Sequence, residues 1–308
     1  MAIQIGILEL SPTANDDEEM DVDSAAGSPL TPHIRGRNEF VAFFRAREVG
    51  IAWATDRIQP LSIILDYRDS LAGPIPQFIG QVKSLVWLDL GRSDLTGTIP
   101  DYLGSLTAMR KLYLAGNSLH GAIPSSLGAL TQLKELSLAG NQLSGPIPDS
   151  LGNLSKLVYL GLRDNKLSGT VPASLGKLTK LRQLWLNNNC LTGALPEELG
   201  GMSSLEQLYV NNNSITGPLP ASLGNLSKLT ILSLRKNCIA GTLPASLSRL
   251  RHLERLSMEH NQLSGNIPLE LAQLTGLKDM SLMHNKFSNK PQARLTLIAS
   301  LPHCVVYI

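Results

Sequence analysis

The stretch LKELSLAGNQLSGPIPDSLGNL (133–154) decides the fold, because its frame returns every 24 residues along the chain. Another copy is LRQLWLNNNCLTGALPEELGGM (181–202), and the shared pattern is LxxLxLxxNxLxGxIPxxLGxLxx. A fixed period of this length indicates a repeat array. Two early copies keep the phase with Ser93 and Asp69 in place of the asparagine, and the other copies carry Asn117, Asn141, Asn165, Asn189, Asn213, Asn237, Asn261 and Asn285.

Each copy predicts one short strand. Leu136 and Leu138 point to one side and Ser137 to the other, which is the period of a half-buried strand. Because every copy has the same phase, the strands must stack in parallel, about 4.8 Å apart. A single copy cannot bury its leucines without neighbours, so we expect one continuous core and a stability that belongs to the whole stack.

The other fixed positions of the repeat have structural explanations. An asparagine just after a strand carries donors and an acceptor that satisfy backbone groups of the turning chain. The glycine of LxG, as at Gly145, suits a tight turn or a positive φ. The proline of IP, as at Pro148, fixes φ and fits the start of a short helical turn. We therefore assign no ligand to these positions.

The frame resembles a leucine-rich repeat, and its LxGxIP half is similar to the plant-type class of receptor ectodomains and of plant inhibitors of cell-wall-degrading enzymes. The resemblance covers about three quarters of the chain. It implies an α/β fold: a right-handed solenoid with a curved parallel β-sheet on the concave face and short 3-10 or helical turns on the convex face. It also implies recognition of proteins, peptides, glycans or small hormones, without naming the ligand.

The chain divides into four regions. Residues 1–34 form an acidic disordered tail, 35–60 an N-terminal capping helix region, 61–290 ten repeats, and 291–308 a C-terminal capping segment with a closing strand. NEFVAFFRAREVGIAW (38–53) resembles the capping helix and tryptophan segment of plant-type arrays, and LIASLPHCVVYI (297–308) resembles the closing strand of other leucine-rich repeat proteins. The paired cysteines of extracellular caps are absent from the N-terminal region.

The tail contains seven acidic residues and no Lys or Arg, so the rest of a chain whose net charge is +2 carries +9. A segment with so little apolar mass cannot form a core. Two interpretations are open: a solvated tail, or an intramolecular shield over basic positions. No basic run is dense enough to indicate nucleic-acid binding.

The expected location is the cytoplasm. MAIQIGILEL has no basic start and does not read as a signal peptide, and no apolar run is long enough to cross a membrane. Cys190 and Cys238 are two turns apart, too far to form a disulfide. The glycosylation sequons at Asn153, Asn212 and Asn225 support an alternative, a secreted or cell-surface recognition protein with a start further upstream. They are weak support, because the tripeptide NLS is also part of the repeat consensus.

The strand face is where binding is expected, because its outward positions vary while the frame is constant. Aromatic residues and arginine, which are enriched in binding hot spots, gather in the middle of this face. The other interpretation is that aromatics pack well on strands. A smooth stretch of small residues around Ala115 and Ala139 lies earlier in the array. The predicted partner-binding residues are Tyr159, Arg163, Asp164, Trp185, Asn187, Asn188, Tyr209 and Asn211.

No catalytic constellation is evident. His260 and His284 are one turn apart, and we expect a solvated pair rather than a metal site, because no third ligand is fixed beside them. Gly176 and Lys177 are followed by Leu178, so there is no phosphate-binding loop. We expect a monomeric, non-enzymatic interaction module that binds a protein or peptide on its concave face, without cofactor, metal, nucleic acid or membrane span. A metal-dependent or other enzyme is the remote alternative.

Overall fold

The computed structural model describes residues 50–53, 60–64 and 71–308. The acidic tail predicted for residues 1–34 lies outside these ranges, as do Asp69 and most of the predicted N-terminal capping region. The last four residues of the segment 38–53 form strand β1 (Gly50–Trp53), which pairs antiparallel with β2 (Pro60–Ile64).

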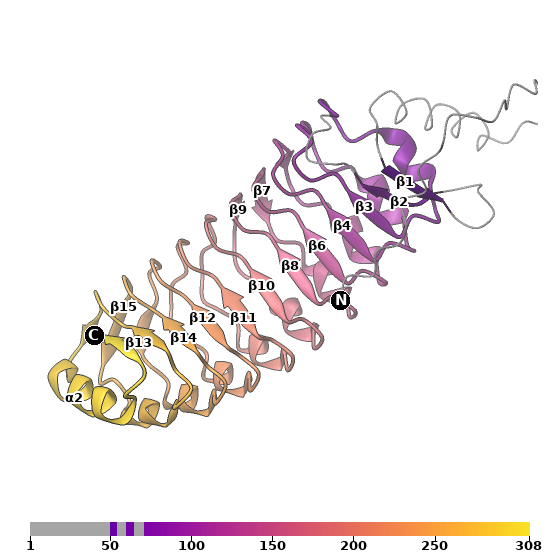
Figure 1. Ribbon diagram of the computed structural model, residues 1–308. Coiled ribbons are helices and arrows are strands. Elements are labelled where there is room, and N and C mark those ends of the chain that lie inside the picture. The colour runs from indigo at the N-terminus through magenta and orange to yellow at the C-terminus, as the bar shows by residue number, and fades with distance from the viewer. Residues whose placement is uncertain (1–49, 54–59, 65–70) are drawn as a thin grey trace, which may run out of the picture.

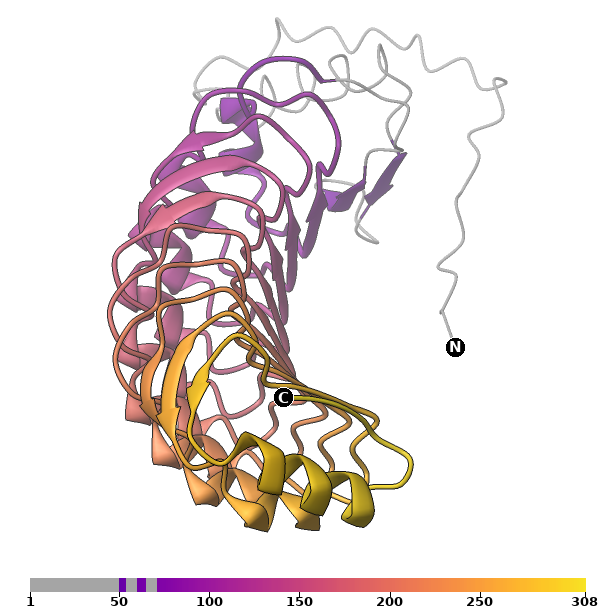
Figure 2. The same cartoon turned by 90° about the vertical axis from the view of Figure 1, so that its left-hand side faces the viewer.

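One curved sheet of twelve strands extends through the described ranges (Figures 1 and 2). Leu136 pairs with Leu160 and Leu184 with Leu208, so the register advances by one repeat per strand. From β2 to β3 the register advances by one residue more than this, because Ile63 pairs with Leu88. After β1 and β2 come β3 (Trp87–Asp89), β4 (Lys111–Tyr113), β6 (Glu135–Ser137), β8 (Tyr159–Gly161), β10 (Gln183–Trp185), β11 (Gln207–Tyr209), β12 (Ile231–Ser233), β14 (Arg255–Ser257), β16 (Asp279–Ser281) and β18 (Val305–Tyr307), all parallel.

Short 3-10 helices form the outer side of the arc (Figure 2). A proline with extended backbone precedes each one, as Pro148 does with φ −65°. The predicted solenoid with a parallel sheet and 3-10 turns is therefore confirmed. The helices are η2 (Gln77–Gln81), η3 (Asp101–Ser105), η4 (Ser125–Ala129), η5 (Asp149–Asn153), η6 (Ala173–Lys177), η7 (Glu197–Gly201), η8 (Ala221–Asn225), η9 (Ala245–Arg249) and η10 (Leu269–Gln273).

Two small parallel sheets, which the sequence analysis did not anticipate, follow the asparagine positions. They use the LxG segment, where Gly145 has φ +77° and Gly265 +72° as the glycine prediction requires. The first contains β5 (His120–Gly121), β7 (Gln142–Pro146) and β9 (Lys166–Ser168), and the second contains β13 (Ala240–Thr242), β15 (Gln262–Gly265) and β17 (Lys286–Phe287).

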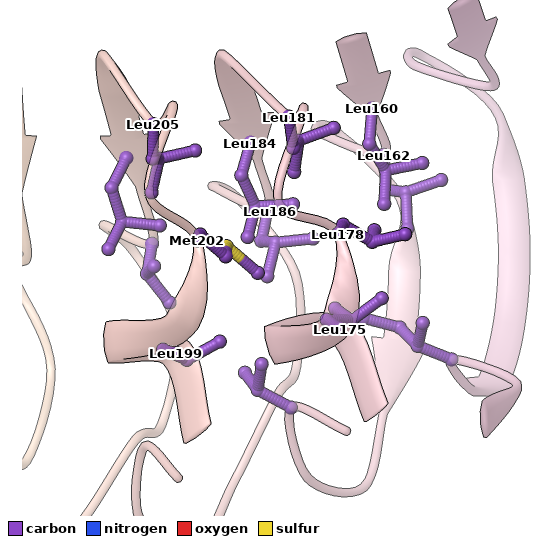
Figure 3. Packing of buried hydrophobic residues seen from close by; sticks show 14 of the residues in the cluster. Leu160, Leu162, Leu175, Leu178, Leu181, Leu184, Leu186, Leu199, Met202 and Leu205 are labelled. Atoms are coloured by element: carbon purple, nitrogen blue, oxygen red, sulfur yellow. The ribbon is translucent and has the colours of Figure 1, made fainter. Parts of the chain in front are cut away.

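Leucine side chains fill the space between the sheet and the 3-10 helices. Leu184 and Leu186 of one turn pack with Leu160 and Leu162 of the previous turn, and all four are fully buried (Figure 3). Burial of one leucine contributes about 1.5–3 kcal/mol, and each leucine obtains part of its cover from the neighbouring turns. The core is therefore shared along the array.

The asparagine ladder holds consecutive turns together. The Asn141 amide donates to the carbonyls of Leu114 (2.9 Å) and Leu138 (3.1 Å), and its oxygen accepts the N–H of Leu119 (3.0 Å). Asn189, two turns further along the array, makes the equivalent contacts. These bonds satisfy backbone groups inside the stack, which confirms the structural role predicted for this column.

The C-terminal end is formed by α2 (Lys290–Ser300) and β18. Pro291 lies in the first turn of α2, and Ala293 and Leu297 bury one face of it. Strand β18 pairs with β16, at the place where the sequence predicts a closing strand.

Candidate functional site

Three aromatic side chains stand together on the concave sheet. Tyr159 comes from β8, Trp185 from β10 and Tyr209 from β11. The Tyr159 and Trp185 ring centroids are 5.3 Å apart with planes at 90°, and those of Trp185 and Tyr209 are 6.0 Å apart at 88°. The Arg163 guanidinium lies 5.1 Å from the Trp185 centroid. Edge-to-face rings and a cation over an indole are both attractive arrangements, so these four residues form one cluster, as predicted.

Gly161 makes room for this cluster. A Cβ added to Gly161 would lie 2.7 Å from Tyr159 Cζ and closer still to the phenol oxygen. The Tyr159 ring therefore lies across the backbone of the glycine that follows it on the same strand. Burial raises the pKa of Tyr159, and a hydrogen bond with Ser137 and the charge of Arg163 partly offset that rise.

Two polar residues of the predicted site, Asp164 and Asn188, form a separate row with Asn212 just after the strands. Asn188 donates to Asp164 (2.5 Å), and Asn212 donates to Asn188 (2.6 Å). All three have φ near +57°, a conformation that Asn and Asp tolerate better than most residues. Arg163 joins the two groups, because its Nε also lies 3.6 Å from Asp164 Oδ2.

Asn211 was predicted as a partner-binding residue, and the structure places it in the interior instead. Only 6% of Asn211 is exposed, and its side-chain oxygen accepts a hydrogen bond from the Ser233 hydroxyl (3.2 Å). Side chains on the inner side of an arc crowd together, so a position that points outward along the strand does not always reach solvent. Asn187 is half-buried for the same reason.

A hollow of the concave face lies earlier in the array than the predicted cluster. It has a volume of about 700 Å³ and includes Tyr159 and Trp185, with Ala115 and Ser137 among the small residues that line it. Arg163, Asp164, Asn187, Asn188, Tyr209 and Asn211 are not part of its lining. We call this hollow the concave groove; its lining is Asp89, Gly91, Arg92, Tyr113, Ala115, Glu135, Ser137, Val158, Tyr159, Arg182, Gln183, Trp185 and Glu206.

A second aromatic cluster lies at the N-terminal end of this groove. The Trp87 and Tyr113 rings meet edge to face at 6.4 Å, and Lys111 Nζ lies 4.8 Å from the Trp87 centroid. Glu135 accepts a hydrogen bond from the Tyr113 hydroxyl and pairs with Lys111 at 3.1 Å. Burial raises the pKa of Tyr113, and the bond to Glu135 raises it further.

Asp89 is the groove carboxylate with the least electrostatic support. Its Oδ1 accepts the N–H of Gly91 at 3.1 Å, and the described residues include no ion pair for it. Burial raises the pKa of Asp89, and the Gly91 bond offsets only part of that rise. A cation brought by a ligand would favour the ionised form.

Sequence reasoning missed this second cluster although one signal was present. Ser137 lies on the strand between those of Tyr113 and Tyr159, and the small stretch at Ala115 and Ala139 lies in the next column. Small residues between two aromatic walls indicate a depression. The two indole Nε1 atoms, of Trp87 and Trp185, are buried without a hydrogen-bond partner in the described structure, which is uncommon for buried donors.

The His260 and His284 rings stack at 4.2 Å with 17° between planes. In the part of the chain that the structure describes, no three His, Cys, Asp or Glu residues gather closely enough to hold a metal ion. Cys190 and Cys238 are free and exposed. Among the described helices, none has the length and apolar character that a membrane crossing needs.

Comparison with protein families gives three matches. The family described as "Leucine-rich repeat region" matches residues 163–303, "Leucine rich repeat" matches 108–167, and "Leucine Rich Repeat" matches 84–106. A comparison with curated proteins found no match.

Solved structures with the same fold include plant receptors. The plant peptide hormone receptor RGFR1 in complex with RGF2 is 34% identical, with a TM-score of 0.73 over 75% of this chain and 37% of that one. The Arabidopsis receptor kinase HAESA, in complex with the peptide hormone IDA and the co-receptor SERK1, is 34% identical, with a TM-score of 0.70 over 77% and 40%. The Leptospira interrogans protein LIC12759 is 31% identical, with a TM-score of 0.57 over 76% and 63%. The chain thus spans less than half the length of these receptors.

Proposed function

Because the chain belongs to the leucine-rich repeat proteins and is of their plant type, we propose that it is a non-enzymatic recognition module that binds a protein or peptide partner on its concave face. The family and the fold support an interaction module. The observation that carries the choice of face is the concave groove, a hollow of about 700 Å³ with aromatic side chains at both ends. Recognition sites for small ligands are commonly of this size.

The groove suits an extended peptide with one bulky side chain. Tyr113 at one end and Trp185 at the other are three strands apart in the sheet, about 14 Å at the usual strand spacing. Ala115 and Ser137 between them leave room for a large apolar group. Aromatic side chains around a desolvated pocket are typical binding hot spots. Two of the similar structures, RGFR1 and HAESA, contain a bound peptide or peptide hormone, which supports a peptide partner here.

The ligand chemistry that fits the groove includes a positive charge. Glu135 pairs with Lys111, and Glu206 pairs with Arg182 at 2.7 Å. Asp89 has no such pair in the described structure, and burial raises the pKa of its carboxyl group. We propose that the partner places a basic group beside Asp89, next to its bulky apolar group.

The comparisons bear on location as well. They give no support to the cytoplasmic expectation, and the similar structures include the leucine-rich repeat ectodomain of a plant membrane receptor kinase. This favours the alternative, a secreted or cell-surface protein. Asn153 and Asn225 are exposed at the ends of η5 and η8, whereas Asn212 is half-buried and donates to Asn188. Glycan on Asn153 and Asn225 of the protein from its natural source would establish passage through the secretory pathway.

Photo-crosslinking tests the choice of face. A photoreactive side chain at Gln183, in the groove, is compared with one at Ser281, four strands further along the same sheet. We expect a partner to be captured from Gln183 and not from Ser281. Capture from Ser281 alone, or equal capture from both positions, would contradict binding in the groove.

A further inference from the structure

The links between each 3-10 helix and the following strand form one flank of the solenoid. Each link has six residues, from the last residue of the helix to the residue before the strand. Neighbouring strands pair in register and neighbouring 3-10 helices contact one another, so the links lie side by side along the arc (Figure 1). We call this surface the basic flank; its described links are 81–86, 105–110, 129–134, 153–158, 177–182, 201–206, 225–230, 249–254 and 273–278.

The flank carries almost nothing but positive charge. Its only acids are Glu206, which pairs with Arg182 at 2.7 Å, and Glu254, which pairs with Lys278 at 2.8 Å. The other nine cations have no ion pair with any described residue. All of the cations are exposed: Lys83, Arg110, Lys134, Lys156, Lys177, Lys180, Arg182, Lys228, Arg249, Arg251 and Lys278.

This distribution concentrates the charge of the whole array. The flank has a net charge of +9, which equals the net charge of all residues after residue 34. Within the ten repeats (61–290), the residues outside the flank have a net charge of −3. Acids at the starts of the 3-10 helices, such as Asp101, Asp149 and Glu197, lie outside the flank. A one-sided field of this kind attracts polyanions and is sensitive to salt.

We infer that the acidic run DDEEMDVD (16–23) of the same chain docks on the basic flank and shields it. This run contains six of the seven acids that precede residue 35, so its charge complements that of the flank. The 26 residues between Asp23 and Gly50 can span up to about 90 Å. The nine links extend over only about 40 Å at the usual strand spacing, so every part of the flank lies within reach.

Tethering makes this contact effective although single surface ion pairs are weak. Exposed pairs contribute about 0.2–1 kcal/mol each, but a segment attached to the same chain has an effective concentration in the millimolar range. The shield lowers the affinity of the flank for other polyanions until the run is displaced, cleaved or neutralised. Val158, Arg182 and Glu206 belong both to the flank and to the lining of the concave groove. Lys134, Lys156 and Lys180 of the flank lie outside that lining, so a contact with these lysines tests the proposal independently of the proposed function.

Binding of a heparin oligosaccharide to the full chain tests the shield. In the tail variant, Asp16, Asp17 and Asp21 become Asn, and Glu18 and Glu19 become Gln. The control makes the same change of net charge outside the flank, at Asp101, Asp149, Glu197, Glu198 and Glu270. At about 50 mM salt we expect the tail variant to bind heparin at least ~10-fold more tightly than the unaltered chain, and the control by less than ~3-fold, with the difference lost near 0.5 M salt. Equal tightening in the two variants would overturn the proposal.

Carbodiimide cross-linking of the unaltered chain is the second measurement. The reagent joins a carboxylate and a lysine amine that are in contact. We expect peptides that connect residues 16–23 to Lys134, Lys156 or Lys180 within a monomer at low salt. Absence of such peptides, or their appearance only in cross-linked dimers, would refute an intramolecular shield.

Discussion

The indole of Trp185 stands edge-on to the phenol ring of Tyr159, with 5.3 Å between the ring centroids and 90° between the ring planes. The two residues are on adjacent strands but in different columns, so the contact is diagonal across the sheet. It places two large aromatic surfaces at one end of the concave groove, and several expectations depend on it.

Replacement of Trp185 by alanine should weaken partner binding by at least ~2 kcal/mol, about 30-fold. The indole lies on the sheet surface outside the leucine core, so the free energy of unfolding should fall by only about 1 kcal/mol for the lost ring contacts. Titration with the captured partner and urea unfolding measure the two effects. Tyr307→Ala, an exposed aromatic at the far end of the sheet, is the matched control. Unchanged affinity of the Trp185 variant would remove this residue from the site.

Gly161→Ala should disturb binding without touching any residue of the core. The added methyl group would overlap the Tyr159 ring, which must then rotate away from Trp185. We expect an affinity loss of roughly 1 kcal/mol or more, because the aromatic wall is no longer preorganised. A loss of the ring contact would be visible in the near-ultraviolet circular dichroism. An affinity equal to that of the unaltered protein would contradict this reading of the Gly161 contact.

Gly152→Ala should lower the stability of the fold and leave the affinity for the partner unchanged. Its Cβ would lie 2.5 Å from the Ser174 carbonyl oxygen of the next 3-10 helix, where only backbone can give way. Overpacking of this kind costs typically about 1–3 kcal/mol. Urea unfolding should show this loss, while the affinity for the partner is retained by the folded fraction. A stability equal to that of the unaltered protein would mean that η5 and η6 are less tightly stacked than described.

Asn141→Ala removes one rung of the asparagine ladder. It leaves the carbonyls of Leu114 and Leu138 and the N–H of Leu119 without their partner inside the stack. Each unsatisfied buried group costs about 1–3 kcal/mol, so the total loss should be at least ~3 kcal/mol. Amide exchange at Leu119 should accelerate. Asn153→Ala, at an exposed asparagine, is the control and should be nearly neutral.

Asp89→Asn should change how stability depends on pH. The pKa of Asp89 is raised in the folded protein, so the folded state holds this proton more tightly than the unfolded state. The free energy of unfolding therefore decreases as pH rises from about 3.8, the ordinary pKa of an aspartate, through the folded pKa. The asparagine variant lacks this decrease, so it should match the unaltered protein at pH 3 and exceed it at pH 7. Urea unfolding at both values measures the difference, and the same offset at both would contradict the assignment to Asp89.

Asp89→Asn should also change the affinity for the partner. If a basic group of the ligand lies beside this carboxylate, Asp89→Asn weakens binding while it stabilises the free protein. A variant that gains stability and keeps full affinity would place the basic group elsewhere in the groove.

Much of the fold could be predicted from the sequence because the local structure of each repeat is determined by residues within that repeat. The strand alternation at Leu136 and Leu138, the positive φ of Gly145 and the extended Pro148 depend on neighbours within a few residues. The ladder role of Asn141 also followed from its position after a strand. Repetition then fixed the stack, since strands of identical phase have only one common register.

The exact site could not be predicted in the same way. The sequence placed Tyr159, Trp185, Arg163 and Tyr209 together, and the structure confirms that cluster. It also suggested that Asn211 is available to a partner, which is wrong, because the Ser233 hydroxyl on the next strand covers and binds it. Tyr113 and Trp185 form the two ends of the groove and are three strands apart. No local sequence pattern predicts the distance between them.

The sequence by itself therefore determined the repeat, its core and the surface on which side chains are free to vary. Only the tertiary structure decided which of those side chains remain open, where the concave groove lies, and that the cations of eight of the nine links gather on one flank. The physical reason is that backbone preferences act over a few residues, whereas exposure and electrostatic field depend on side chains that the stacking and curvature of the solenoid bring together.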